Sequence, residues 1–314
     1  FNNSAVNYTV ANASGTVAIT GTAGLTKQGT GTVTLSSANT YTGATTITAG
    51  TLRIGDGGTS GTRGTGDVTN SGSLIFNRSD IITVANKISG GGSFSQAGSG
   101  TTILTAINNY TGTTSIASGS TLQMGNGGTT GQLGSGDVTN NGSLIINRSN
   151  GGTVSGILSG TGTLTFTGGG LSSLSKPNTY TGATIITGGS TLFITSIANG
   201  GVTSNIGAST NAATNLVLDN GTFRYAGATT STDRLFSVGT SGGTLLISNA
   251  PLNFTNTGSM GFNGQSGART LTFTANYVGT SSFAVNIGDN GGATSLTKSG
   301  TGTLALTSNN TFTG

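Results

Sequence analysis

Aspartate is the chain's only acidic residue type, so any acid–base chemistry rests on it. Seven of the 314 residues are acidic, all seven are Asp, and His and Cys are absent. This composition excludes thiol and imidazole catalysis, zinc sites built from Cys or His, and disulfide bonds. It leaves glycoside hydrolysis, which needs two carboxyl groups roughly 5 to 9.5 Å apart. The candidates are Asp56, Asp67, Asp80, Asp137, Asp219, Asp233 and Asp289.

The positions of these aspartates do not predict a working pair. Asp67 and Asp137 occupy equivalent positions in two similar segments, and three coils of chain between them would hold them roughly 14 Å apart. Asp219 and Asp233 are the two that a turn would bring close together. A calcium loop's alternating acidic ligands are missing around Asp56. We therefore predict no catalytic residue, no cofactor, no metal site and no enzyme activity.

Three arginines and a row of aromatic residues offer another chemistry, the recognition of sugars. Arg78 and Arg148 stand at matching positions, and Arg224 lies between two aromatic residues. Such guanidinium groups bind acidic glycans, or else cap a strand edge or stack on a ring, and we favour the structural roles. A recurring aromatic residue stacks sugars or packs at a coil corner, and we favour the corner. The aromatic row is Tyr41, Tyr110, Tyr180 and Phe312.

Threonine pairs raise ice binding as a minor alternative. Thr-x-Thr occurs at residues 32–34, 163–165 and 272–274. Regular outward rows of threonine on a β-solenoid can bind ice, but residues such as Arg53 and Gln123 interrupt the pattern here. The favoured explanation is the preference of Thr for solvated strands.

The composition excludes several further classes of protein. Gly contributes 58 residues, Pro 2 and charged residues 6%, whereas soluble globular domains carry about a quarter charged residues. Gly, Thr, Ser and Asn fill most positions and leave few helix formers. The net charge of +4 is scattered, so we predict no nucleic-acid partner. No apolar run reaches the roughly 18 residues of a membrane span. We expect membrane contact only through a barrel or anchor outside this segment.

Short alternating groups of apolar residues predict many short strands. Leu52-Arg53-Ile54 and Leu122-Gln123-Met124 each place two apolar side chains on one strand face and a polar one on the other. Clusters of Gly, Asn and Ser, which are typical of turns, separate such groups. The pattern predicts an all-β protein rather than a disordered chain.

An internal repeat organises these strands. Asn39-Thr40-Tyr41-Thr42-Gly43 recurs at residues 108–112 and 178–182 and in part at 310–314, and the three tyrosines are 69 and 70 residues apart. Further blocks, such as Gly66-Asp67-Val68-Thr69-Asn70, recur with an offset of 70 residues. A period of this length divides into three coils of roughly 23 residues, as expected of a β-solenoid.

We therefore expect one continuous β-solenoid of roughly thirteen coils over residues 1–314. In chain order it comprises repeat 1 (25–93), repeat 2 (94–163), a diverged section (164–295) and the start of a further repeat (296–314). Neither Phe1 nor Gly314 carries an evident polar cap, so we expect each end to continue into more chain or to pair with another copy. Ile75 and Ile145 predict a second apolar face.

Residues 31–52, GTVTLSSANTYTGATTITAGTL, closely resemble the autotransporter-associated β-strand repeat, also called the passenger-associated transport repeat. The segments that end at Leu122, Leu192 and Gly314 resemble it with lower fidelity or length. The resemblance implies a right-handed parallel β-helix passenger on a Gram-negative cell surface, exported through an outer-membrane β-barrel. The absence of Cys fits export through a narrow pore.

The residues and the resemblance together lead to one functional prediction. We expect a structural segment, a stalk or fibre, of a cell-surface or extracellular autotransporter-like protein that supports adhesion or forms filaments or matrix. The alternative is a β-helix segment that binds or degrades polysaccharide. The expected partners are further copies of the chain, bound end to end or laterally, and surface glycans.

Overall fold

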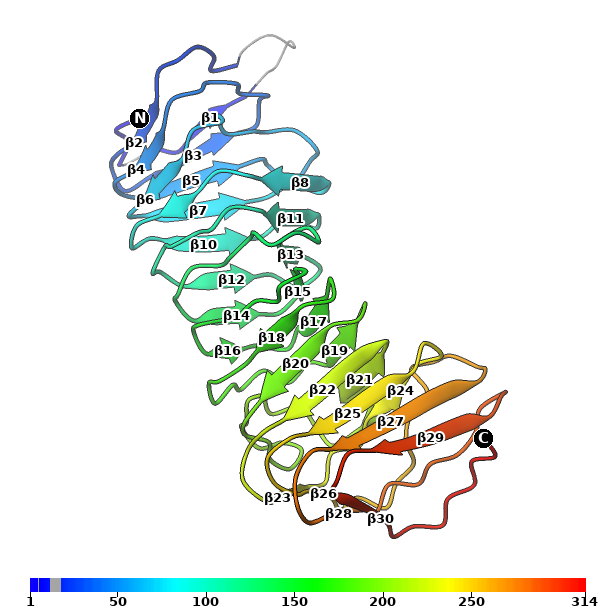
Figure 1. Ribbon diagram of the computed structural model, residues 1–314. Coiled ribbons are helices and arrows are strands. Elements are labelled where there is room, and N and C mark those ends of the chain that lie inside the picture. Colours follow the sequence, from blue (N-terminus) through cyan, green and yellow to red (C-terminus); the bar gives the residue numbers. More distant parts are fainter. Residues whose placement is uncertain (5, 12–17) are drawn as a thin grey trace. The chain divides into compact units, whose positions relative to one another are not determined.

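Alternating apolar and polar residues form short strands, and the computed structural model shows these strands in parallel coils (Figure 1). It describes residues 1–4, 6–11 and 18–314. The fold is all-β with almost no helix, a β-solenoid of about 13 turns that follow one another about 22 residues apart. The predicted fold class is confirmed, with coils close to the expected length.

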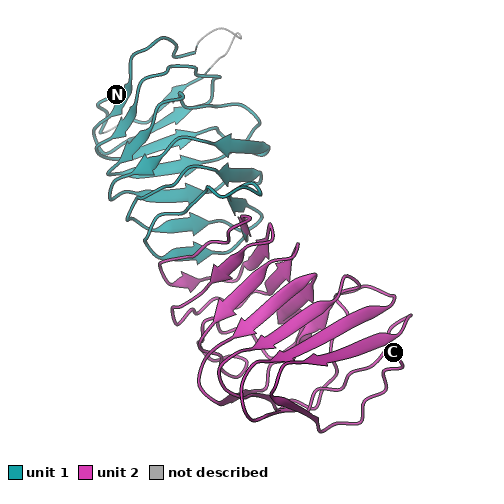
Figure 2. Ribbon diagram, viewed as in Figure 1, with its two compact units in different colours: residues 1–145 teal, residues 146–314 magenta. Residues whose placement is uncertain are grey.

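Contacts divide the described chain into two compact units, Phe1–Ile145 and Ile146–Gly314 (Figure 2). Within the described ranges the single helical element is a 3-10 turn, η1 (Ala213–Asn215). No helix in this part of the chain is long and apolar enough to cross a membrane. Each unit is therefore built from strands and turns.

Unit 1 holds three parallel sheets. They run β1-β3-β5-β7-β10-β12-β14, β2-β4-β6-β9 and β8-β11-β13. The strands are β1 (Tyr8–Val10), β2 (Leu25–Lys27), β3 (Thr32–Leu35), β4 (Thr45–Ile47), β5 (Thr51–Ile54), β6 (Val68–Asn70), β7 (Ser73–Phe76), β8 (Ile81–Val84), β9 (Ile88–Ser89), β10 (Ser93–Gln96), β11 (Thr101–Leu104), β12 (Thr114–Ile116), β13 (Thr121–Met124) and β14 (Val138–Asn140). A further strand, β15 (Ser143–Asn147), begins in this unit.

Unit 2 also holds three parallel sheets. They run β17-β19-β21-β24, β18-β20-β22-β25-β27-β29 and β23-β26-β28-β30. The strands are β16 (Leu158–Ser159), β17 (Thr163–Thr167), β18 (Leu171–Ser173), β19 (Thr184–Thr187), β20 (Thr191–Ile194), β21 (Leu216–Asp219), β22 (Gly221–Tyr225), β23 (Thr230–Thr232), β24 (Ser237–Val238), β25 (Gly243–Ile247), β26 (Leu252–Phe254), β27 (Arg269–Ala275), β28 (Thr280–Phe283), β29 (Thr294–Ser299) and β30 (Thr303–Leu306).

The register of the strands places apolar side chains on one another. Leu52 of β5 pairs with Val33 of β3 and with Leu74 of β7, and all three are fully buried. Burying a side chain of this kind contributes about 1.5–3 kcal/mol, so the core is a column of small, repeated contributions. The predicted alternation, apolar inward and polar outward, is confirmed in these strands.

The second apolar face expected at Ile75 does not form around that residue. Ile75 is half-exposed, and its register partners are Arg53 of β5 and Ser95 of β10. Ile145 is half-exposed as well. Polar neighbours on both sides therefore interrupt any apolar row that would begin at Ile75.

Glycine allows the backbones of adjacent coils to touch. A Cβ added to Gly112 would overlap the carbonyl oxygen of Gly92, and one added to Gly136 would overlap the carbonyl oxygen of Gly112. These three residues form a column in which each coil lies directly against the last. The glycine of the repeat motif is therefore required here for close approach.

Candidate functional site

An asparagine in each of the three full copies of the repeat motif ties three successive coils together. Asn108 is buried, its Oδ1 accepts the N–H of Ile88 in the preceding coil at 2.8 Å, and its Nδ2 donates to the carbonyl of Gln132 in the following coil at 2.7 Å. Asn39 and Asn178 make the same two kinds of bond within their own units. A side-chain amide carries both an acceptor and donors, which explains why this residue type recurs.

The repeated tyrosines pack inside the coils and offer no sugar-stacking surface. Tyr41, Tyr110 and Tyr180 are at most 1% exposed. Each hydroxyl bonds to the threonine four residues later, at 2.6–2.7 Å. Burial raises the pKa of the Tyr110 and Tyr180 hydroxyls, so both stay neutral. Phe312, the fourth member of the row, is half-exposed. The packing role expected for the three tyrosines is confirmed, and the sugar-stacking interpretation is wrong for them.

The three arginines singled out from the sequence are held by groups of the protein. Arg78 is 8% exposed and pairs its Nε and Nη2 with the two carboxylate oxygens of Asp80, at 2.8 and 2.6 Å. Its guanidinium group holds the pKa of Asp80 below the usual range. Arg224 lies over the ring of Phe193, 5.3 Å from the centroid, so the expected stacking role is confirmed there. Arg148 donates from Nε and Nη2 to an asparagine two residues later.

The aspartates of the diverged section cap loops. Asp219 accepts from the N–H of Ser241 and from Nε2 of Gln265. Asp233 accepts from the N–H of Gly200 at 2.7 Å. The two carboxylates that a turn was expected to bring together therefore serve different loops. Among residues 1–4, 6–11 and 18–314, no three His, Cys, Asp or Glu side chains gather in a way that could hold a metal ion.

One outward face of unit 2 carries a regular threonine column, contrary to the expected irregularity. We name the outward side of β20, β22, β25, β27 and β29 the threonine face. Its first column is in register and consists of Thr191, Thr222, Thr244, Thr272 and Thr297. The column beside it is mixed and consists of Phe193, Arg224, Leu246, Thr274 and Ser299. The face therefore lacks the regular double row expected of an ice-binding surface. A polar hollow of about 240 Å³ lies at its edge, lined by Gly, Asn, Ser and Thr.

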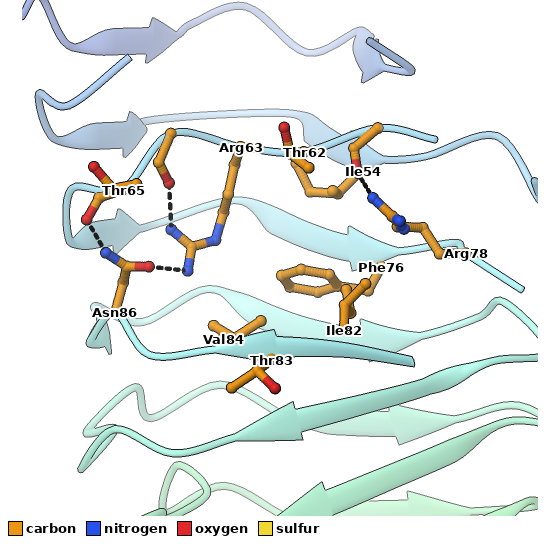
Figure 3. Close-up of a pocket in the computed structure, with 12 residues that line it drawn as sticks. Ile54, Thr62, Arg63, Thr65, Phe76, Arg78, Ile82, Thr83, Val84 and Asn86 are labelled. Atoms are coloured by element: carbon orange, nitrogen blue, oxygen red, sulfur yellow. Dashed lines mark hydrogen bonds between the residues drawn. The ribbon is translucent and has the colours of Figure 1, made fainter. Parts of the chain in front are cut away.

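A second cavity, of about 170 Å³, lies in unit 1 beside β8 (Figure 3). β8 is the edge strand of its sheet, and the preceding coil contributes residues 61–65 to the lining, a segment that forms no strand. Phe76 and Val84, both buried, contribute apolar wall. Thr65 and Thr83 are exposed members of the lining, so the cavity opens to solvent on their side.

Arg63 is the charged side chain that sequence reasoning missed at this cavity. It is 8% exposed, its Nη1 donates to the carbonyls of Gly64 and Gly66 at 3.2 Å, and its Nη2 donates to Oδ1 of Asn86 at 2.8 Å. Its Nε donates to no acceptor among the residues that the structure describes. Burial lowers its pKa to about 10, so the group stays charged at neutral pH. The available signal was the 70-residue offset, at which Leu133 takes the place of Arg63.

The segments that contain these asparagines and tyrosines match a known repeat family. The model of the passenger-associated-transport-repeat matches residues 25–54, 94–124, 157–192 and 296–314. The chain is an autotransporter passenger repeat protein. In this passenger segment, the third match begins inside the expected repeat 2 and reaches into the section expected to be diverged.

A curated relative supports the same conclusion for the passenger segment. The "Adhesin BmaC autotransporter" of Brucella suis biovar 1 (strain 1330) is 32% identical over 258 residues, an alignment that covers 71% of this chain and 8% of the relative. The passenger segment thus spans a small part of the length of that protein. No solved structure matches the chain at a comparable significance.

Proposed function

We propose that this passenger segment is a spacer on the surface of a Gram-negative bacterium, a stalk whose length is set by its number of coils. The observation that carries the proposal is the asparagine bridge, in which Asn108 bonds to the coil before it and to the coil after it. Parallel strand ladders join the same coils. Such a segment keeps the same construction however many coils it contains.

Further support comes from what the polar side chains do. The buried tyrosine hydroxyls, the Arg78–Asp80 pair and the loop-capping aspartates are all engaged within the protein. Their interactions hold coils and turns in place. This is the distribution expected of a segment whose role is mechanical, and the relative's name as an adhesin suits a protein that must hold a binding part away from the cell.

A deletion of one period tests the spacer. Removing residues 55–124 joins Ile54 to Gly125, which occupy successive equivalent positions, and takes out three strands from each of two sheets of unit 1 and two from the third. Because Ile54 ends β5 and its equivalent Met124 ends β13 of another sheet, the deletion also turns the following coils by one face. Because the chain has no native Cys, spin labels attach cleanly to Cys introduced at the exposed residues Thr40 and Asn141.

Distance measurement between the two labels decides the outcome. We expect the component of the label separation along the coil axis to shorten by about 14 Å, three times the spacing of neighbouring strands, and the measured separation is compared with the one expected after both this shift and the turn by one face. An intact far-ultraviolet spectrum with an unchanged separation, or a shortening unrelated to three coils, would show that coil number does not set length.

Glycan adhesion on the threonine face is a second candidate function. The face presents hydroxyl groups in register, a polar hollow of about 240 Å³ at its edge, and a ring–guanidinium stack formed by Phe193 and Arg224. Hydroxyl groups and exposed rings suit a hydroxylated ligand such as a sugar chain. A glycan array tests it with Phe193→Ala and with the matched control Gln123→Ala, which changes the equivalent position of repeat 2. Binding lost only in Phe193→Ala supports adhesion by this face, and no binding by the unmodified chain leaves the spacer alone.

A further inference from the structure

We propose that the cavity beside β8 is a binding site for a small monocarboxylate with a compact apolar body, and that Arg63 is its anion-binding residue. The site belongs to unit 1. The bridge of Asn39 ends on the carbonyl of Thr62, a lining residue next to Arg63, and so helps to hold this wall of the cavity.

The guanidinium group of Arg63 leaves one of its edges without protein partners. Nη1 is used by two carbonyls, and Nη2 donates to Oδ1 of Asn86. Figure 3 shows Asn86 on the side of Nη2 that is away from Nε, while Nε and the other side of Nη2 face Phe76 and Val84. Nε has no protein acceptor. The pair of N–H groups that forms the side-on fork of an arginine, the geometry that matches a carboxylate, therefore lies on the side of the guanidinium group that faces Phe76 and Val84.

Arg63 forms no direct ion pair within the described residues, although the carboxylate of Asp67 lies near enough to favour its charged form. The ion pair found there joins Arg78, the other arginine of the lining, to Asp80 at 2.6 Å. Arg78 is thus neutralised, and one positive charge remains at the cavity. A buried charge that no carboxylate contacts directly is costly. Asp67 offsets part of that cost from a distance, and a monoanion bound to Arg63 would lower it further. A dianion such as phosphate would bring a second negative charge, and the cavity has no second unpaired cation among the residues described there to balance it.

The apolar side chains of the lining indicate the size and polarity of the part of the ligand that carries the carboxylate. Ile54, Phe76 and Val84 are at most 4% exposed and line the cavity. A void of about 150 Å³ lined by such residues accepts a molecule the size of benzene, and this cavity measures about 170 Å³. A carboxylate on an apolar body of this size fits the space between these side chains. Because Nε is screened from solvent, a bidentate contact requires a small shift of the side chains around it.

The second repeat shows the same position without the charge. At an offset of 70 residues, Leu133 replaces Arg63 and Gly156 replaces Asn86, whereas Thr83 and Val84 are retained as Thr and Val. Leu133 is 1% exposed. A leucine therefore satisfies the coil at this position, and the fold does not need an arginine there. The arginine and the asparagine that holds it change together between the repeats, as expected of a site that one copy has and the other lacks.

Benzoate is the probe that tests the site. Isothermal titration at pH 7 compares the unmodified chain with the double variant Arg63→Leu/Asn86→Gly, which reproduces the residues of the second repeat. Lys87→Gln is the matched control, since it removes one exposed positive charge outside the lining. Benzamide, which has the same body without the charge, and inorganic phosphate are the comparison ligands. We expect benzoate to bind the unmodified chain and Lys87→Gln equally, and at least about tenfold more weakly to the double variant, the loss of one charge-assisted contact.

The outcomes divide cleanly. Benzoate binding that is lost with Arg63, together with weaker binding of benzamide, supports the site. Equal binding of benzoate and benzamide, phosphate binding as tight as that of benzoate, or no benzoate binding at all overturns it. If the double variant does not fold by circular dichroism, Arg63→Lys replaces it. That variant keeps the positive charge but lacks the paired N–H groups of arginine. Benzoate binding as tight as that of the unmodified chain would contradict the role of Arg63 as the anion-binding residue.

Discussion

Replacing Asn108 with Ala is expected to lower the free energy of unfolding by about 2–6 kcal/mol. The side chain is 1% exposed, and its removal leaves the N–H of Ile88 and the carbonyl of Gln132 without the bonds of 2.8 and 2.7 Å that they now make. Each buried polar group left without a partner costs about 1–3 kcal/mol. A domain is stable by about 5–15 kcal/mol, so the loss is a large share of the total.

Urea unfolding followed by circular dichroism measures this loss. The matched control is Asn109→Ala, which changes the exposed neighbour of the same residue type and is expected to stay within about 0.5 kcal/mol of the unmodified chain. Amide hydrogen exchange adds a local readout, because the Ile88 amide is expected to exchange faster in Asn108→Ala alone. Equal losses in the two variants, with unchanged protection of Ile88, would refute the bridging argument.

Two further predictions concern backbone contact and pH. Gly112→Ala is expected to lower the melting temperature, by a destabilisation of about 1–3 kcal/mol, whereas Gly128→Ala, whose new Cβ would meet nothing within 4 Å, is expected to leave it nearly unchanged; similar melting of the two variants would contradict the close-approach argument. Arg78 lowers the pKa of Asp80 in the folded state, so this pair contributes stability above the unfolded pKa of about 3.9 and loses it as pH falls through the folded value. Urea midpoints measured between about pH 6 and 2 should fall on acidification, and less steeply in Arg78→Gln; identical slopes would count against the pair.

Much of the fold follows from the sequence because its physical causes are local. Leu52 and Leu122 alternate with polar residues over a few positions, and such alternation decides which strand face is buried. The 70-residue offset then shows that the strands belong to coils. The offset does not show which groups of the neighbouring coils lie above and below a given residue. For this reason Asn108 is visible in the sequence as a recurring residue, but its bonds to Ile88 and Gln132 are not.

The candidate sites were harder to predict, because exposure depends on the neighbouring coils. Arg78 and Asp80 are two residues apart, a spacing that places both on one side of an extended segment, yet the sequence gives no reason to expect a buried pair. Arg63 faces a cavity beside β8, the edge strand of its sheet, where residues 61–65 form no strand, a tertiary feature without a sequence pattern. The threonine face likewise depends on strand register, which joins threonines from segments of unequal length.

The asparagine bridge has a consequence for how such chains change in evolution. Both partners of Asn108 are backbone groups, and every residue except proline offers the same backbone groups. Side chains at the partner positions can therefore change without loss of these hydrogen bonds. A period that is duplicated, deleted or moved by recombination keeps its own asparagine, which can bond to the backbone of whichever coils come to lie beside it. The gene can therefore gain or lose whole periods, and the coils that become neighbours can form the asparagine bonds without further mutation.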